Sequence, residues 1–189
     1  MSFFKKIPTS VLQAKSNFER AVDDAFSQKS HDVIANSSVP YAQYAMAKLL
    51  DVVSQEHSGS NTLDVRLLSP NLNAQEYNHP MLIESLDRCL KLCRSFNVLV
   101  VGSINNPDKN EFAKRIDFDH KATLETDVGD DLNLEKPLRS MLVVGERALR
   151  FQADLLNGHV CFNNPEKAKN LINYFDGRSK KNRPLALSK

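Results

Sequence analysis

The sequence lacks the features that mark membrane-spanning and secreted proteins. The 189-residue chain contains no apolar run that approaches the ~20 residues needed to cross a bilayer. Residues 1–10 do not have the pattern of a secretory signal. The cysteines, Cys89, Cys93 and Cys161, are odd in number and show no CxxC spacing, which favours free thiols in a reducing compartment. We therefore expect a cytoplasmic protein that does not bind membranes.

The chain also lacks an excess of either charge. It has 25 Lys and Arg against 23 Asp and Glu, a net charge of +2, so its overall charge gives no argument for an anionic partner. Hydrophobic residues make up 41% and charged residues 25%, values typical of a globular domain and not of a disordered chain. The length is enough for one domain with a core and some peripheral helices.

The first third of the chain predicts two helices. Apolar residues recur at helical spacing in 11–26 and again in 41–53, and Pro40 suits the first turn of the second helix. We expect residues 1–61 to form a helical segment that packs on the core or on a partner. The first helix has an apolar stripe that must be buried against the sheet or serve as an interaction surface for assembly. The stripe consists of Val11, Phe18 and Val22.

Residues 62–177 predict an α/β core domain. A strand at 63–67, an amphipathic helix at 81–95 and an apolar strand at 98–101 indicate a βαβ unit with parallel strands. Further strands are predicted at 122–126, 141–144, 149–152 and 159–162. A last helix opens at Asn164-Pro165 and is expected to end at Gly177. The predicted fold is a mixed sheet with parallel central strands, flanked by helices on both faces.

No catalytic, metal or cofactor site can be assembled from the sequence. Cys89 and Cys93 share a helix face, but no spacing supplies further metal ligands, so we assign them to the core. The acidic stretch 117–135 fits a calcium loop only loosely and is interpreted as a solvated loop. His120 and His159 are the candidates for an unrecognised catalytic site. His120 could act as a general base, but no nucleophile can be identified near it.

The C-terminal residues 178–189 predict a flexible basic tail. Basic clusters of this kind can contact nucleic-acid phosphates without reading sequence, although they also occur as solvated segments. The cluster consists of Arg178, Lys180, Lys181 and Arg183.

The order of predicted elements from Thr62 to Gly177 resembles a phospholipase D-like domain. The strand over 138–145 has the spacing of that family's His-x-Lys-x4-Asp motif, and 162–175 is similar to its closing turn and helix. The resemblance implies a histidine that attacks phosphorus and a lysine that holds the phosphate. Here Leu138, Ser140 and Gly145 stand at the three motif positions, and neither leucine nor serine can supply that chemistry. The resemblance thus implies a member without the catalytic apparatus.

Three functions stay open. The first is a non-catalytic interaction or structural protein that acts through protein contacts, possibly as an oligomer. The second is a nucleic-acid-associated accessory protein that uses the basic tail. The third is a hydrolase or transferase with a site at His120 or His159. Function must be argued from a site, and the sequence does not locate one.

Overall fold

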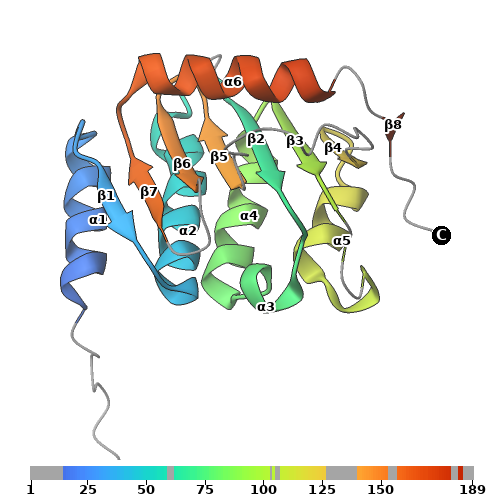
Figure 1. Ribbon diagram of the computed structural model, residues 1–189, viewed down its shortest axis with the longest axis horizontal. Coiled ribbons are helices and arrows are strands. Elements are labelled where there is room, and N and C mark those ends of the chain that lie inside the picture. The colour runs from blue at the N-terminus through green and yellow to red at the C-terminus, as the bar shows by residue number, and fades with distance from the viewer. Residues whose placement is uncertain are drawn as a thin grey trace, which may run out of the picture.

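The chain folds into one mixed sheet with helices on both faces (Figure 1). The computed structural model describes residues 15–58, 62–102, 104, 107–126, 140–152, 157–179 and 183–184. The predicted fold class is confirmed. Within the described ranges, no helix is both long enough and apolar enough to cross a membrane.

The sheet has eight strands in the order β1-β7-β6-β5-β2-β3-β4-β8. The neighbours β2, β3 and β4 are parallel, and every other neighbouring pair is antiparallel. β2 therefore has a parallel neighbour on one side and an antiparallel neighbour, β5, on the other. The strands are β1 (Ile34–Asn36), β2 (Asp64–Ser69), β3 (Ser95–Val100), β4 (Ala122–Thr126), β5 (Ser140–Val144), β6 (Ala148–Gln152), β7 (Gly158–Cys161) and β8 (Arg183–Pro184).

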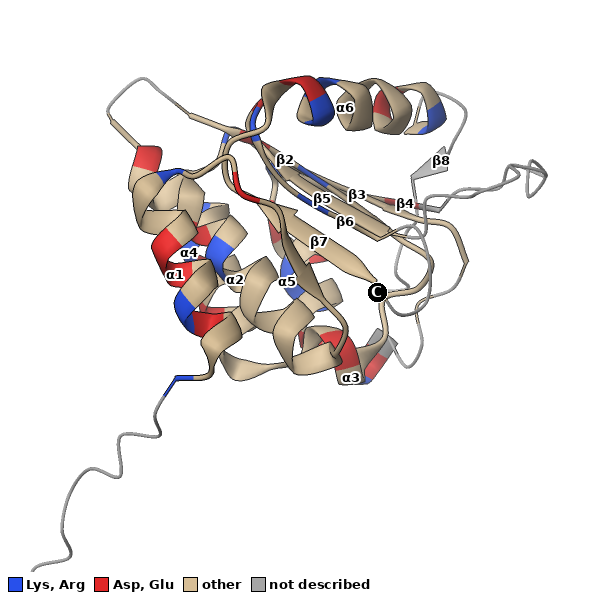
Figure 2. Cartoon of the chain, turned by 60° about the vertical axis from the view of Figure 1, so that its left-hand side comes forward, with Lys and Arg blue, Asp and Glu red and all other residues tan. Residues whose placement is uncertain are grey.

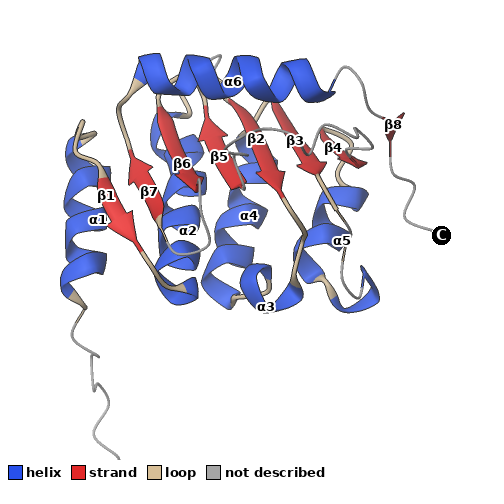
Figure 3. Ribbon diagram, viewed as in Figure 1, coloured by secondary structure: helices blue, strands red, loops and turns tan. Residues whose placement is uncertain are grey.

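The helices form two unequal layers, as Figures 2 and 3 show. On one face of the sheet, α6 (Pro165–Ser179) is the only helix among the described ones. The opposite face is covered by α1 (Asn17–Gln28), α2 (Val39–Glu56), α4 (Pro80–Leu92) and α5 (Glu111–Phe118), with the short α3 (Ala74–Tyr77) and a 3-10 turn (Pro107–Lys109). Figure 2 shows both acidic and basic residues on α1 and on α6.

A hydrophobic core lies on each side of the sheet. The larger core joins α2 and α4 to the inward side chains of β2 and β3, including Leu49, Leu67 and Phe96. The smaller core joins Leu171 and Phe175 of α6 to the other face of the same strands. Because β2 and β3 are covered on both faces, each contains adjacent apolar residues, Leu67 and Leu68 in β2 and Val98 to Val100 in β3.

Most predicted elements of the core domain are present. β2, α4 and β3 form the expected βαβ unit, with β2 and β3 parallel. The strand predicted at 122–126 is β4, and the hairpin predicted after residue 141 is β5 and β6. Gly145 makes the tight turn between them at a φ of +59°, a conformation that favours glycine.

Two predictions of local structure were wrong. No strand was predicted in the first third of the chain, but β1 lies between α1 and α2 and pairs with β7. Gly177 was expected to end the last helix, but α6 continues to Ser179. In the part of the C-terminal tail that the structure describes, β8 pairs with Glu125 and Thr126 of β4.

The first helix packs within its own chain. Val22 is fully buried in the larger core, and the Phe18 ring stacks on Tyr41 of α2 with 4.3 Å between centroids. Val22 is therefore used inside the chain, whereas Phe18 is only partly buried against the core. Val11 lies outside the described residues. The helix begins at Ser16, whose hydroxyl and Glu19 form a capping box.

Candidate functional site

Polar residues from four strands meet at one edge of the sheet. We call the edge where β2 and β3 end the carboxyl edge; β5 and β7 begin there, and β1 and β6 end there. Strand pairing places four residues side by side along it: Asn36 opposite Gly158, Gly158 opposite Gln152, and Gln152 opposite Ser140. Ligand sites of open α/β sheets lie at such edges, where the strand order changes direction around one strand. Here that strand is β2.

Arg150 is the charged residue of this edge. Arg150 precedes Gln152 by two residues on β6, so both side chains point to the face of the sheet that α2 covers. Its side chain is 5% exposed. Nη1 donates to Ser140 Oγ at 3.1 Å, and Nη2 donates to Gln152 Oε1 at 3.1 Å and to Asn36 Oδ1 at 3.4 Å. All three acceptors are neutral oxygens.

No carboxylate among the described residues forms an ion pair with Arg150, although the negative charge of Glu76 acts on it and raises its pKa against the effect of burial. Its Nε is buried and makes no hydrogen bond within the part of the chain that the structure describes, and the same is true of Asn36 Nδ2. Burial lowers the pKa of Arg150, but an arginine stays charged in a protein. The edge therefore holds a buried cation, and two buried donors, its own Nε and Nδ2 of Asn36, make no hydrogen bond among the described residues.

Gly158 makes room for this arginine. A Cβ at residue 158 would lie 2.5 Å from Asn36 Oδ1 and 2.9 Å from Arg150 Nη2. Both distances are too short for any side chain larger than hydrogen. The close approach of β7 to Arg150 therefore requires glycine at this position.

α3 closes the neighbouring part of the edge. Tyr77 is 3% exposed and donates its hydroxyl to Ser69 Oγ at 3.0 Å, at the end of β2. Burial raises the pKa of Tyr77. Gln43 of α2 holds α3 in place, because its Nε2 donates to the backbone oxygens of Gln75 and Glu76 at 3.1 and 3.0 Å. This wall is anchored to the helix that also covers Arg150.

The opposite edge of the sheet is built differently. At this amino edge, Asp64 of β2 accepts from Arg94 Nε at 2.8 Å and from Ser95 Oγ at 2.7 Å. The hydrogen bond from Arg94 lowers the pKa of Asp64, and burial opposes it only in part. Glu56, at the end of α2, forms ion pairs with Lys29 at 3.3 Å and with Arg147. Cations and carboxylates are matched here.

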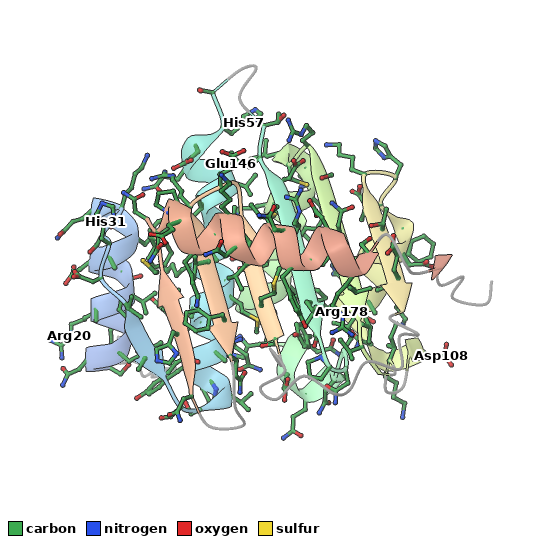
Figure 4. All side chains as sticks on the ribbon, turned by 45° about the horizontal axis from the view of Figure 1, so that its top comes forward. Arg20, His31, His57, Asp108, Glu146 and Arg178 are labelled. Atoms are coloured by element: carbon green, nitrogen blue, oxygen red, sulfur yellow. The ribbon has the colours of Figure 1, made fainter. Side chains whose placement is uncertain are left out.

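The structure describes the side chain of only one residue of the predicted basic cluster, Arg178. Arg178 lies in the last turn of α6, where Nη1 donates to Tyr174 Oη at 2.9 Å and the guanidinium lies 5.7 Å from the ring centroid. The backbone of Arg183 belongs to β8. Lys180 and Lys181 lie outside the described residues. Figure 4 shows Arg178 well apart from His31 and Glu146, so these labelled side chains do not share a site.

The predicted catalytic histidines are also separate. His120 is exposed on the turn before β4. His159 lies on β7, and its ring stacks on Phe151 with 5.1 Å between centroids, on the face covered by α6. It therefore points away from Arg150. Among the described residues, no group of three or more His, Cys, Asp or Glu could hold a metal ion.

The other residues named in the sequence analysis lie in the core or at strand ends, where they are described. Cys89 and Cys93 are buried in the larger core, at 0% and 2% exposure. Ser140 is 8% exposed at the start of β5, and Gly145 lies at the other end of that strand. Leu138 and residues 127–135 of the acidic stretch lie outside the described residues.

A second surface feature lies between α4 and α5. A groove of about 450 Å³ is lined by residues of both helices, and Phe118 at its rim is 86% exposed. Its charged residues include three acids and three bases: Asp87, Lys91, Glu111, Lys114, Arg115 and Asp119. Arg115 pairs across the groove with Asp87 at 2.7 Å, and within α5 Glu111 pairs with Lys114 at 3.2 Å and with Arg115 at 3.0 Å. The groove has an apolar anchor but no charge preference.

Sequence reasoning missed Arg150. The signal was present, because Ala148, Arg150 and Gln152 alternate with Leu149 and Phe151 in a strand that pairs with an apolar one. An arginine on the inward face of such a hairpin is unusual. Its importance became visible only when Asn36 and Ser140 were placed beside it.

Comparisons with known proteins support the fold. No protein-family model and no curated protein matches the chain. The structure is similar to Nuc, a phospholipase D family member from Salmonella typhimurium, with a TM-score of 0.51 and 11% identity over 82% of this chain and 97% of that chain. It is also similar to TrmBL2, an archaeal chromatin protein with a novel mode of DNA binding. That match has a TM-score of 0.54 and 13% identity over 88% of this chain and 61% of that one. At these identities the likeness establishes a distant phospholipase D-like fold.

Proposed function

We propose that this protein is a non-catalytic, nucleic-acid-associated accessory protein with a phospholipase D-like fold. The observation that carries the proposal is the bond from Arg150 to Ser140. Ser140 stands where the family motif has its lysine, so a positive charge is retained there by another residue. Leu138 stands where the motif has its histidine, and a leucine cannot attack phosphorus. Such an edge suits binding without hydrolysis.

Two further observations support nucleic acid as the partner. The chromatin protein TrmBL2, which binds DNA, is similar over 88% of this chain. The sequence also places Arg178, Lys180, Lys181 and Arg183 close together after the last core strand. A small basic cluster on a chain with a net charge of +2 favours weak, salt-dependent binding.

The test combines a binding assay with a hydrolysis assay on the full chain. Fluorescence anisotropy with labelled duplex and single-stranded DNA should show binding that weakens steadily as NaCl is raised. Neither DNA nor a chromogenic phosphodiester should be cleaved. Absence of binding at low salt would overturn the proposal. Cleavage that disappears in a His120→Ala, His159→Ala double variant would instead establish the enzyme hypothesis.

A tail variant shows which residues make the contact. Changing the four basic tail residues to Gln should weaken binding and reduce the salt slope by about one unit for each lost phosphate contact. Equal loss in a control variant would point to overall charge and not to the tail. The control changes Arg20, Lys91, Lys109 and Lys114 to Gln.

Protein contact is a second candidate function, favoured by Phe118. A phenylalanine that is 86% exposed beside a groove is the kind of aromatic anchor found at protein interfaces. Phe118→Ser should leave the free energy of unfolding within about 0.5 kcal/mol, because the side chain is exposed. It should also reduce self-association in analytical ultracentrifugation. A wild-type chain that stays monomeric at all concentrations would contradict self-association through this groove.

A further inference from the structure

Phe118 is an aromatic side chain that the fold leaves exposed. It lies in the last turn of α5, and 86% of it is exposed. On the inner face of the same helix, Phe112 and Ile116 are buried in the larger core. Removing an aromatic ring from water is favourable, and rings that a single chain leaves exposed are typical anchors of protein interfaces. Phe118 is therefore available for a contact outside its own chain.

The groove between α4 and α5 is a surface that can receive such a ring. Leu90, which is 5% exposed and belongs to the larger core, contributes an apolar part of its lining, and the groove has a volume of about 450 Å³. Phe118 lines the rim but does not fill the groove, because a ring seated in it would be buried. The ring and the groove thus match in chemistry but are not joined within one chain.

The charges around the groove identify the partner that suits it. Three acids and three bases line the groove, so a partner with charges of only one sign would meet like charges there. A second copy of the same surface brings equal numbers of both signs and can be complementary to the first. The groove is therefore suited to a copy of this chain.

Two of the six charged residues remain for contacts with the second copy. The other four form ion pairs with one another: Asp87, Glu111, Lys114 and Arg115. Lys91 and Asp119 form no ion pair among the described residues. Lys91 lies in the last turn of α4, and Asp119 directly follows α5. Because both helices connect parallel strands, their carboxyl ends lie at the same end of the groove.

We propose that two copies of this chain associate about a two-fold axis at this groove, so that Phe118 of each copy enters the groove of the other. The proposal deepens the protein-contact candidate above and rests on it. A two-fold interface uses the same patch of both copies, so every contact is made twice. An axis near the carboxyl ends of α4 and α5 places Lys91 of one copy opposite Asp119 of the other.

Sedimentation velocity of the full chain at increasing protein concentration measures the association. The wild type should shift from monomer to dimer. Phe118→Ser should raise the dimer Kd by about 30-fold, the loss expected when an aromatic anchor is removed. Lys169→Asp on α6 is the control, because Lys169 is exposed on the other side of the sheet, and it should leave the Kd unchanged. A wild type that stays monomeric, or a Kd that Phe118→Ser does not change, overturns the proposal.

Charge exchange tests the two-fold arrangement without changing Phe118. Lys91→Asp alone should weaken the dimer at least about tenfold, because both copies then bring carboxylates together at two contacts. Adding Asp119→Lys to the same chain should restore the Kd to near the wild-type value, since opposite charges meet again and the net charge stays +2. Asp119 also accepts from the backbone N of Lys121 at 2.8 Å, so the test is the restoration and not the effect of Asp119→Lys alone. No restoration overturns the two-fold arrangement.

The outcomes separate this interface from the proposed nucleic-acid function. A wild type that dimerises but does not bind DNA supports the interface, while the nucleic-acid function fails. DNA binding by a chain that stays monomeric overturns the interface and leaves the function standing. If both occur, Phe118→Ser should weaken DNA binding several-fold, because a dimer brings two basic clusters to one duplex. The variant with both charges exchanged should bind DNA as the wild type does.

Discussion

The two edges of the sheet differ in how their charged groups are paired. At the amino edge, Asp64 is paired with Arg94, and Glu56 is paired with Lys29 and Arg147. At the carboxyl edge, Arg150 is more deeply buried than any of these cations, yet it contacts only neutral oxygens. A protein has no need of an unpaired buried charge for its stability. The contrast indicates that the amino edge stabilises the fold through matched charges, whereas the carboxyl edge holds a buried cation that neutral oxygens keep in place.

The largest effect is expected from closing the space at the carboxyl edge. Gly158→Ala should lower the free energy of unfolding by about 2 kcal/mol, because the new methyl group overlaps Asn36 and Arg150. Urea unfolding measures this change. Gly177→Ala is the matched control: a Cβ there has no neighbour within 4 Å, and α6 should gain about 0.5–1 kcal/mol. Equal effects of the two substitutions would mean that the carboxyl edge is not tightly packed.

A smaller effect is expected from breaking the matched charges of the amino edge. Arg147→Gln should destabilise the chain by about 1–2 kcal/mol, because Glu56 is a mostly buried carboxylate and would keep only Lys29. Arg88→Gln provides the comparison, since its pair with Asp51 is exposed and should contribute less than about 1 kcal/mol. If Arg147→Gln costs no more than Arg88→Gln, the amino edge is not specially stabilised.

The smallest effect is a pH dependence at the same edge. The pKa of Asp64 is lowered in the folded chain, so its pairing stabilises the fold at neutral pH and is lost as the pH falls below ~4, through the folded pKa. Asp64→Asn should cost up to about 1 kcal/mol at pH 7 and nothing in strong acid. Urea unfolding from pH 7 to pH 2.5 would show the two curves converging. Asp117→Asn is the control, because Asp117 is exposed: its free energy of unfolding should differ from that of the wild type by the same amount at every pH.

Local patterns identified the central elements because their burial is regular. The run at 98–101 indicated β3, and the segments at 122–126 and 141–144 indicated β4 and β5. β1 and β8 escaped prediction because they have only three and two residues, too few for any periodicity to show. Their pairing depends on partners that are distant in the sequence, β7 and β4.

The sequence by itself determined the alternation of strands and helices, the βαβ unit and the residues that fill the core. Each of these follows from the spacing of apolar residues along a few turns or strand repeats. Only the tertiary structure decided that Arg150 is a buried cation without a carboxylate. That decision depends on which strands pair, since Asn36 and Arg150 are 114 residues apart and meet only because β1 lies on β7 and β7 on β6. The environment of a charge is set by neighbours in space, and a local pattern cannot report them.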